Sequence, residues 1–277
     1  MNYIKDLDIK DTLLNALRED IGTGDITTKA LIRGNKTIKA EILVKEDFAV
    51  CGLAVAALVF KLQDKTVKFK PYARDGDFVK KGKILALVSG RARSILTAER
   101  VALNFLSLLS GISTKTKKFV DAAKPYRVKI LDTRKTVPCL RLLEKYAVRI
   151  AGAFNHRESL DEMILVKDNH LKCIGGVNKL SGFSRKYKVE IEVKNLKELK
   201  TALLLNPDII MLDNMSVQNM KKALLLRNRV SGKIKLEASG GITLKNIKKV
   251  ASTGVDFISV GDLTSSIKSV DISLEVL

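Results

Sequence analysis

The sequence predicts an α/β protein with a β-rich N-terminal part and a parallel C-terminal sheet. Seven short apolar runs lie between residues 128 and 260, and helical stretches separate most of them. Strands that alternate with helices at this spacing indicate a parallel sheet, and seven units approach a (β/α) barrel, one short of the usual eight. The earlier part of the chain carries short alternating strands instead. An open doubly wound sheet is the alternative, but the first β-to-α turn lacks a glycine-rich dinucleotide loop.

The N-terminal part is expected to begin with an amphipathic helix over residues 10–20, which ends at Gly22. Apolar and polar residues then alternate over residues 38–50, which is the period of a strand. The pattern predicts a second helix over residues 52–62. Short strands with tight turns are expected over residues 66–90.

A very apolar helix is expected to follow. Thr97 can cap its N-terminus, and Gly111 is expected to lie just beyond its end, at about Ser110. Arg100 and Asn104, one turn apart, interrupt its apolar surface. Because an unpaired guanidinium is very costly to bury, we expect Arg100 to meet an anion, either an acidic side chain of the same subunit or a group outside it.

The rest of the chain repeats a strand–helix unit. The runs expected as strands are Val128–Leu131, Val148–Ala151, Met163–Val166, Val189–Val193, Ile209–Leu212, Ile234–Ala238 and Phe257–Val260. The helices expected between them are Leu140–Tyr146, Leu196–Leu204, Val217–Asn228 and Leu244–Thr253.

Composition excludes several classes of protein. Regular apolar spacing excludes a disordered chain, and the longest apolar run, Gly52–Phe60, is far shorter than the roughly 20 residues of a membrane span. The first ten residues lack the apolar core of a secretion signal, and three widely spaced cysteines indicate reduced thiols. We therefore expect a soluble, cytoplasmic protein.

The net charge of +20 comes from 50 basic and 30 acidic side chains. Aromatic residues make up only 5% of the chain, Trp is absent, and basic residues are not interleaved with aromatic ones as in nucleic-acid-binding surfaces. A lysine-rich solvated surface explains most of the charge, so we expect neither a nucleic-acid nor a membrane partner.

Polar or glycine residues lie at or near the end of each expected strand. In strand order they are Asp132-Thr133-Arg134-Lys135, Asn155-His156-Arg157, Lys167-Asp168-Asn169-His170, Glu190 with Glu192, Asp213-Asn214, Ser239-Gly240-Gly241 and Gly261. Active-site groups of a barrel gather at the C-terminal ends of its strands. The first three ends are cationic, the next two anionic and the last two rich in glycine, so the sequence predicts one site with three chemically different parts.

Each part suits a different chemical group. Arg134, Arg157 and Lys167 suit a substrate rich in carboxylates, because guanidinium groups bind carboxylates bidentately. Glu192 and Asp213 are hard oxygen donors suited to a Mg²⁺ ion that bridges a pyrophosphate. The glycine-rich ends offer backbone N–H groups where barrels commonly hold a phosphate. This combination suggests phosphoribosyl transfer.

Structural roles are the alternative for single residues. His156 and His170 are the two histidines of the chain, and a lone histidine at a strand end is more often a structural hydrogen-bonding group than a catalyst. The glutamates suit an ordinary barrel interior, and Gly240-Gly241 suits a tight turn. The coincidence of all seven strand ends favours a site.

Seven segments also carry a resemblance to a known family. They are Glu19-Asp20-Ile21-Gly22-Thr23-Gly24-Asp25-Ile26-Thr27-Thr28, Glu99-Arg100-Val101-Ala102-Leu103-Asn104, Asp132-Thr133-Arg134-Lys135-Thr136, Asn155-His156-Arg157, Lys167-Asp168-Asn169-His170, Leu212-Asp213-Asn214 and Ala238-Ser239-Gly240-Gly241. In order and over nearly the whole chain, they resemble quinolinate phosphoribosyltransferase (nicotinate-nucleotide pyrophosphorylase, carboxylating).

The resemblance implies an N-terminal α+β sandwich domain and a C-terminal incomplete, seven-stranded (β/α) TIM-like barrel. We expect the first domain over residues 1–110 and the barrel over 111–266, with residues 267–277 packed back on the first domain. It also implies the family's reaction, in which quinolinate and phosphoribosyl diphosphate yield nicotinate mononucleotide, pyrophosphate and CO₂ in de novo NAD biosynthesis.

The resemblance further implies the role of each site residue. The residues that bind quinolinate are then Arg134, Lys135, His156, Arg157 and Lys167. Glu192 and Asp213 face phosphoribosyl diphosphate and its Mg²⁺, Ser239, Gly240, Gly241 and Gly261 surround the phosphate, and Lys135, Glu192 and Asp213 are the catalytic residues. A homodimer, or a higher oligomer built from it, places Arg100 in the site of the neighbouring subunit.

The sequence departs from the family pattern in a few places. Cys139 stands where the family has glycine, Ala151 and Ala153 flank Gly152 in a glycine-rich segment, and Asp262 replaces a small or apolar residue. These side chains narrow the backbone approach to a substrate but remove no charged ligand.

Three other interpretations remain open on the sequence. A divergent pyrophosphorylase-like paralogue associated with molybdenum transport is one, but the intact segments Asp132–Thr136 and Lys167–His170 argue against it. An aldolase-like barrel would use Lys167 to form a Schiff base. A nucleic-acid-binding protein would use the basic surface, with an affinity that falls steeply with salt.

Overall fold

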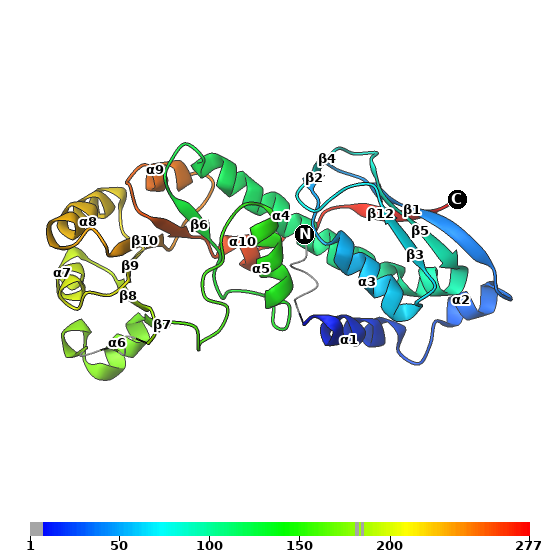
Figure 1. Cartoon of the computed structure of the whole chain (residues 1–277), viewed down its shortest axis with the longest axis horizontal. Helices are drawn as coiled ribbons and strands as arrows, with labels where there is room; N and C mark the ends of the chain where they lie inside the picture. The colour runs from blue at the N-terminus through cyan, green and yellow to red at the C-terminus, as the bar shows by residue number, and fades with distance from the viewer. Residues whose placement is uncertain (1–7, 181–182, 184–185) are drawn as a thin grey trace. The chain divides into compact units, whose positions relative to one another are not determined.

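The computed structural model describes residues 8–180, 183 and 186–277 (Figure 1). Its contacts divide the chain into two compact units. Unit 1 comprises Met1–Lys117, Val137–Gly152 and Ser266–Leu277, and unit 2 comprises Lys118–Thr136 and Ala153–Ser265. The expected domain limit at residue 110 lies close to the first of these limits, but residues 137–152, expected within the barrel, group with unit 1.

Unit 1 is built around an antiparallel sheet with the strand order β12-β1-β5-β3. Its strands are β1 (Thr37–Val44), β2 (Phe48–Ala49), β3 (Lys68–Pro71), β4 (Phe78–Val79), β5 (Ile84–Arg91) and β12 (Ile272–Val276), and its helices are α1 (Lys10–Ile21), α2 (Ile26–Leu31), α3 (Leu53–Gln63), most of α4 (Ala92–Ala123), and α5 (Arg141–Ile150). The alternation predicted for β1 is confirmed, since Ala40, Ile42 and Val44 are fully buried. The C-terminal strand β12 pairs with β1, so the end of the chain forms an edge of this sheet.

Helix α4 is much longer than predicted. It begins at Ala92 rather than near Thr97, and it continues through Gly111 to Ala123. A β-carbon at Gly111 would overlap the carbonyl oxygen of Lys268. The glycine therefore permits close approach of the C-terminal segment and does not end the helix.

The apolar character of α4 has a structural explanation. By length and composition α4 could cross a membrane, but 61% of its most apolar window is buried, which is common in the core helix of a globular domain. Arg100 and Asn104 lie on its exposed side. The expectation that Arg100 needs an anion to compensate for burial is therefore wrong for the single chain, because water can solvate this guanidinium.

Unit 2 contains a six-stranded sheet with the order β6-β11-β10-β9-β8-β7, in which all neighbouring strands are parallel. Its strands are β6 (Lys129–Leu131), β7 (Ile164–Val166), β8 (Val189–Val193), β9 (Ile209–Asp213), β10 (Lys235–Ser239) and β11 (Phe257–Ser259). The helices that accompany them are α6 (Asp168–Ile174), the 3₁₀ helix η2 (Val177–Lys179), α7 (Leu196–Leu204), α8 (Val217–Val230), α9 (Ile247–Ala251) and α10 (Asp262–Ser265). The predicted α/β class and parallel sheet are confirmed.

The second predicted strand is wrong. Residues Val148–Ala151 form the end of α5, because the apolar positions of that helix continue to Ile150. The place next to β6 is taken by Phe154, which makes one parallel bridge to Leu131 and exchanges backbone hydrogen bonds with Ile130 and Asp132. Within residues 8–180, 183 and 186–277, no bridge joins Phe154 to β7, so the barrel wall is incomplete at this point.

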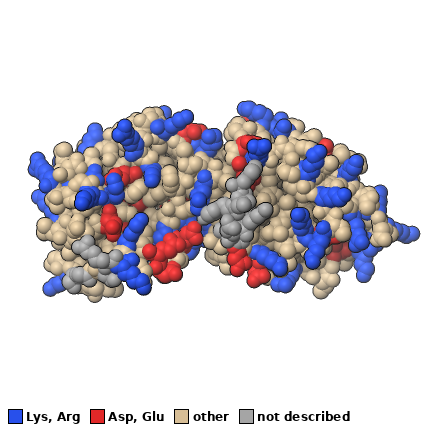
Figure 2. All heavy atoms as spheres, viewed as in Figure 1, with Lys and Arg blue, Asp and Glu red and all other residues tan. Residues whose placement is uncertain are grey.

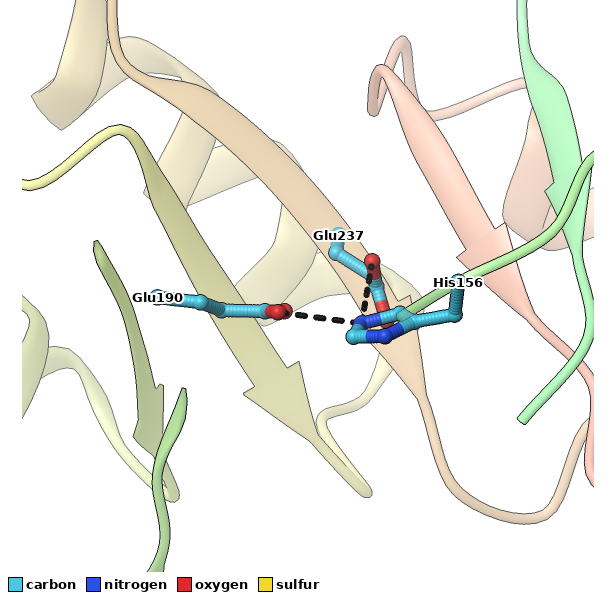
Figure 3. Close-up of side chains that lie close together, drawn as sticks. All are labelled: His156, Glu190 and Glu237. Atoms are coloured by element: carbon cyan, nitrogen blue, oxygen red, sulfur yellow. Dashed lines mark hydrogen bonds and ion pairs between the residues drawn. The ribbon is translucent and has the colours of Figure 1, made fainter. Parts of the chain in front are cut away.

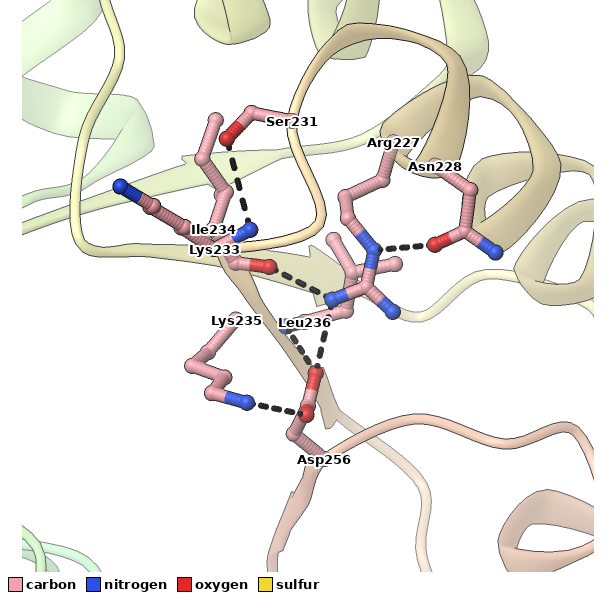
Figure 4. Close-up of polar contacts among 8 residues, drawn as sticks. All are labelled: Arg227, Asn228, Ser231, Lys233, Ile234, Lys235, Leu236 and Asp256. Atoms are coloured by element: carbon pink, nitrogen blue, oxygen red, sulfur yellow. Dashed lines mark hydrogen bonds and ion pairs between the residues drawn. The ribbon is translucent and has the colours of Figure 1, made fainter.

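An ion-pair network around the buried Arg227 side chain holds the amino ends of β10 and β11 (Figure 4). Arg227 of α8 donates to the Ile234 carbonyl at 2.6 Å and pairs with Asp256 at 3.2 Å. Asp256 also accepts from the Leu236 backbone and from Lys235. This network lies at the end of the strands away from the predicted site, where barrel residues typically serve stability.

The contact of Gly111 gives a stability prediction. Gly111→Ala is expected to lower the free energy of unfolding by about 1–3 kcal/mol, because the new methyl group must push α4 away from the backbone of Lys268. Urea denaturation measures the change. Gly232→Ala is the matched control, since a β-carbon there meets nothing within 4 Å, and it should stay within about 0.5 kcal/mol. Equal effects of the two substitutions would contradict the packing role.

Candidate active site

The carboxyl ends of the parallel strands surround a pocket of about 810 Å³ in unit 2. Every site residue predicted within this unit lines it, namely Arg134, Lys135, His156, Arg157, Lys167, Glu192, Asp213, Ser239, Gly240, Gly241 and Gly261. Parallel strands place their carboxyl ends at one edge, which explains how residues more than 100 positions apart meet. Arg100 belongs to unit 1.

Two arginines give one wall of the pocket its positive charge. The Arg157 side chain is almost fully buried, and its Nη1 donates to the Met163 carbonyl at 2.9 Å. Within the described residues, the Nε groups of Arg157 and Arg134 are buried and have no hydrogen-bond partner. Burial, and then the charge of Arg134, lower the pKa of Arg157. Unsatisfied guanidinium donors held close together favour an anionic ligand.

Asp132 fixes the position of the segment that carries His156 and Arg157. Its buried carboxylate accepts hydrogen bonds from the Asn155 amide and, at 2.9 Å, from the His156 backbone N–H. These two hydrogen bonds connect the end of β6 to the residues just before Arg157. Asp132 belongs to a motif noted in the sequence, but its positioning role depends on a contact across 24 residues that no local pattern reveals.

His156 lies between two glutamates on the floor of the pocket (Figure 3). Its Nε2 is 3.0 Å from Glu190 of β8 and 3.7 Å from Glu237 of β10. Burial, and then the charge of Glu190, raise the pKa of Glu237 to about 8. Sequence reasoning missed Glu237, because a glutamate in a short apolar run gives no sign of the strand beside it.

Glu192 and Asp213 form the acidic part. Burial, and then the charge of Asp213, raise the pKa of Glu192. A buried carboxylate whose ionisation is opposed by a neighbouring carboxylate belongs to a donor set that a divalent cation would stabilise, so these residues fit the predicted Mg²⁺.

Asn214 is a further positioning residue. Its side-chain amide donates to Asp213 at 2.9 Å, and its backbone N–H donates to the Ser239 carbonyl at 2.8 Å. A β-carbon at Gly240 would overlap this amide. Gly240 therefore leaves the space that lets Asn214 orient Asp213, a role that the prediction of a phosphate-binding turn did not include.

Gly261 and Lys135 are matched in the same way. A β-carbon at Gly261 would lie 3.2 Å from the Lys135 side chain. The glycine lets the lysine extend across the end of β11. A side chain at position 261, two residues after β11 ends, would therefore require Lys135 to move.

His170 is structural, as the alternative interpretation expected. Its Nδ1 accepts the Lys167 backbone N–H at 3.0 Å, at the start of α6. The Lys167 side chain is exposed. A Schiff-base lysine is usually desolvated to lower its pKa, so this exposure argues against the aldolase interpretation.

Two of the four departures from the family pattern, Ala153 and Asp262, belong to unit 2, which contains the pocket. Of the four, Asp262 is the one among the lining residues in the described part of unit 2. Ala151 and Ala153 are buried, and Cys139 is exposed with a φ of 65°. This left-handed conformation favours glycine, which accounts for the residue expected there.

Basic side chains are spread over both units on the face shown in Figure 2. This distribution agrees with a lysine-rich solvated surface. The cationic wall of the pocket is a separate, buried feature.

A parallel, barrel-like sheet with buried cations, paired carboxylates and glycine-rich strand ends defines an enzyme that handles anionic, phosphorylated substrates. The particular family follows from comparison with known proteins. The chain belongs to the quinolinate phosphoribosyltransferase family: residues 25–110 match the model of its N-terminal domain and residues 112–275 match that of its C-terminal domain.

Relatives and solved structures agree with this assignment. The chain is 40% identical over 266 residues to the "probable nicotinate-nucleotide pyrophosphorylase [carboxylating]" of Synechocystis sp., covering 94% of this chain and 90% of the relative. It is 39% identical over 281 residues to the Bacillus subtilis protein of the same name, covering 100% and 95%. The nicotinate-nucleotide pyrophosphorylase structure from Francisella tularensis superposes with a TM-score of 0.90 at 40% identity, over 97% of this chain and 96% of that one. The corresponding Ehrlichia chaffeensis structure gives 0.92 at 37% identity, over 98% and 100%.

The position of Asp132 gives the second prediction. Asp132→Ala is expected to lower the free energy of unfolding by about 2–4 kcal/mol, because the Asn155 amide and the His156 N–H both lose this buried acceptor. Asp161→Ala removes an exposed carboxylate from a loop of the same unit and should change stability by less than about 0.5 kcal/mol. A loss for Asp132→Ala no larger than this control would refute the positioning role.

Proposed function

We propose that this protein is a quinolinate phosphoribosyltransferase of de novo NAD biosynthesis. It would convert quinolinate and phosphoribosyl diphosphate to nicotinate mononucleotide, pyrophosphate and CO₂. The observation that carries this proposal is the pair of arginines whose buried Nε groups have no partner among the described residues. The names of the relatives give no support to the molybdenum-transport paralogue or to an aldolase.

Quinolinate carries two adjacent carboxylates, which suit the cationic wall. Arg134 and Arg157 offer guanidinium groups, and Lys167 and Lys135 add positive charge at the rim. Each charge-assisted hydrogen bond contributes about 1.5–3 kcal/mol. The first carboxylate satisfies donors that are otherwise buried without partners, and the second orients the ring, so that its nitrogen faces the acidic part of the pocket.

Phosphoribosyl diphosphate occupies the opposite part in this proposal. Backbone N–H groups of residues 239–241 and Gly261 hold its 5′-phosphate, as glycine-rich strand ends do in other barrels. Glu192 and Asp213 would hold Mg²⁺, and the bound ion would supply positive charge to offset that of the pyrophosphate. Asn214 keeps the Asp213 carboxylate oriented.

The pyridine nitrogen then attacks the anomeric carbon of the ribose while pyrophosphate departs. Glu192 and Asp213 stabilise the positive charge that develops on the sugar. The product nitrogen is positively charged, and this charge stabilises the electron pair left on the ring when the neighbouring carboxylate leaves as CO₂. The reaction requires no covalent enzyme intermediate.

We further infer a homodimer in which the exposed Arg100 of one subunit enters the site of the other. Its exposure on α4 leaves the guanidinium free to contact a second subunit. A cytoplasmic location also stays a prediction; the three cysteines are free, as expected there.

Substrate choice tests the proposed function. Nicotinate lacks one of the two carboxylates and would leave buried cations unsatisfied, so its kcat/KM should be at least about 100-fold lower than that of quinolinate. Steady-state kinetics with phosphoribosyl diphosphate and Mg²⁺ measures the ratio. Comparable values for the two acids would contradict the assignment of the cationic wall.

A binding experiment tests the metal role. Asp213→Asn should weaken the use of phosphoribosyl diphosphate at least about tenfold, because it removes one anionic ligand of Mg²⁺. Quinolinate affinity, measured alone by calorimetry, should change by less than twofold. A large loss of quinolinate affinity would place Asp213 in the quinolinate site instead.

Subunit mixing tests the role of Arg100. Arg100→Ala and Lys167→Ala should each be nearly inactive. If Arg100 acts on the partner's site, each mixed dimer contains one intact site and one doubly altered site. Random exchange makes half of the dimers mixed, so activity should recover to about a quarter of wild type. No recovery after verified subunit exchange would exclude the shared site.

A further inference from the structure

The His156, Glu190 and Glu237 cluster contains more acidic groups than the hydrogen bonds around it can keep ionised. Both glutamate side chains are completely inaccessible to solvent. The charge on Glu190 opposes ionisation of Glu237. Two buried carboxylates side by side require at least one proton between them, as in the carboxylate pairs of other active sites. This proton resides on one of the three residues of the cluster.

The hydrogen bonds of His156 locate its own proton. Its Nδ1 lies 2.8 Å from the backbone N–H of Arg157 and accepts that hydrogen bond, so it carries no proton. The ring proton is therefore on Nε2, which donates to Glu190 at 3.0 Å. In this arrangement His156 is neutral, and its single donor is used by Glu190.

Glu237 is left without such a donor. Within the described residues, no hydrogen bond of good geometry reaches either of its carboxylate oxygens, although the nearby Ser259 hydroxyl favours the ionised form. An ionised carboxylate buried in this way is very unfavourable, whereas a neutral carboxyl group is tolerated. The neighbours agree: burial and Glu190 raise the pKa of Glu237 to about 8, against smaller opposing effects of His156, Ser259 and Lys167. The extra proton of the cluster therefore resides on Glu237.

A metal ion is the alternative occupant of this cluster. One ligand atom from each of the three residues lies within 4.8 Å of the others, which resembles a metal site. A histidine bound to a metal through Nε2 would, however, need its proton on Nδ1, where it normally donates to an acceptor. Here Nδ1 faces the Arg157 N–H, so a proton on Nδ1 would meet another hydrogen. The geometry favours a shared proton over a metal.

Glu237 lines the same pocket as Arg134 and Arg157, which hold quinolinate in the proposed function. Decarboxylation leaves an electron pair on the ring carbon, and this carbon needs a proton. Neutral Glu237 is a carboxylic acid at the floor of that pocket, whereas guanidinium groups hold their protons too tightly to donate them. Resting on the proposed function, we propose that Glu237 is the general acid that protonates the ring carbon from which CO₂ departs.

As the bond between the ring carbon and the carboxylate breaks, its electron pair forms a C–H bond with the carboxyl proton of Glu237 in the same step. CO₂ leaves, and Glu237 becomes a carboxylate. After product release, water returns a proton to Glu237, and the buried negative charge of Glu190 makes this return favourable.

A first-turnover experiment on Glu237→Gln separates this role from a structural one. Glutamine has nearly the same shape but has no acidic proton. Rapid quench follows pyrophosphate and CO₂ in the same reaction. We expect pyrophosphate formation within about threefold of wild type and CO₂ formation lowered about 100-fold or more, with phosphoribosylated quinolinate accumulating. Glu237→Asp keeps a carboxylic acid, so its rate of CO₂ formation should be at least tenfold higher than that of Glu237→Gln. Equal slowing of both products, or unchanged CO₂ formation, would overturn the proposal.

The pH dependence of the wild-type reaction is a second test, and it does not depend on whether a variant folds. As pH rises above about 8, Glu237 loses its proton, so CO₂ release should fall about tenfold per pH unit while pyrophosphate release does not. Parallel pH profiles for both products would also overturn the role of Glu237. Wild-type protein that forms neither product would instead refute the proposed function itself.

Discussion

The site depends on two arginines whose buried Nε groups have no hydrogen-bond partner within the described residues. Burial, and then the charge of Arg134, disfavour the charged form of Arg157, although Glu190 and Glu162 oppose this effect. The fold tolerates this because Asp132 fixes the segment before Arg157 and the Met163 carbonyl accepts one of its N–H groups. The stability lost to this repulsion is recovered when an anion binds, so the same constraint that weakens the free protein favours a dicarboxylate ligand.

The order of the strands separates the opposite charges of the pocket. Cationic residues follow β6, the Phe154 segment and β7, whereas Glu192 and Asp213 stand at the ends of β8 and β9. The glycine-rich ends of β10 and β11 lie on the other side of the acidic pair. A substrate with two carboxylates and a substrate with phosphates are thereby drawn to different parts of one cavity. Beneath them, burial and the charge of Glu190 raise the pKa of Glu237, so the floor of the pocket differs in acidity from its walls.

Most of the parallel sheet could be predicted, because each apolar run was short and each was followed by a polar strand end. The exceptions have physical reasons. Residues 148–151 are as apolar as a strand, but they continue the buried face of α5. Gly111 has the sequence position of a helix end, and only its contact with Lys268 shows that it serves close packing instead. The candidate site was predicted well where charged residues cluster in sequence. Its supporting residues, such as Asn214 and Glu237, act through neighbours on other strands, which one sequence does not reveal.

The most direct test of the central claim is mass spectrometry of the products formed from quinolinate, phosphoribosyl diphosphate and Mg²⁺. If the cationic wall holds quinolinate beside the phosphate-binding strand ends, nicotinate mononucleotide and CO₂ should appear in equal amounts with pyrophosphate. Absence of nicotinate mononucleotide and CO₂ from a folded, full-length preparation would contradict the account.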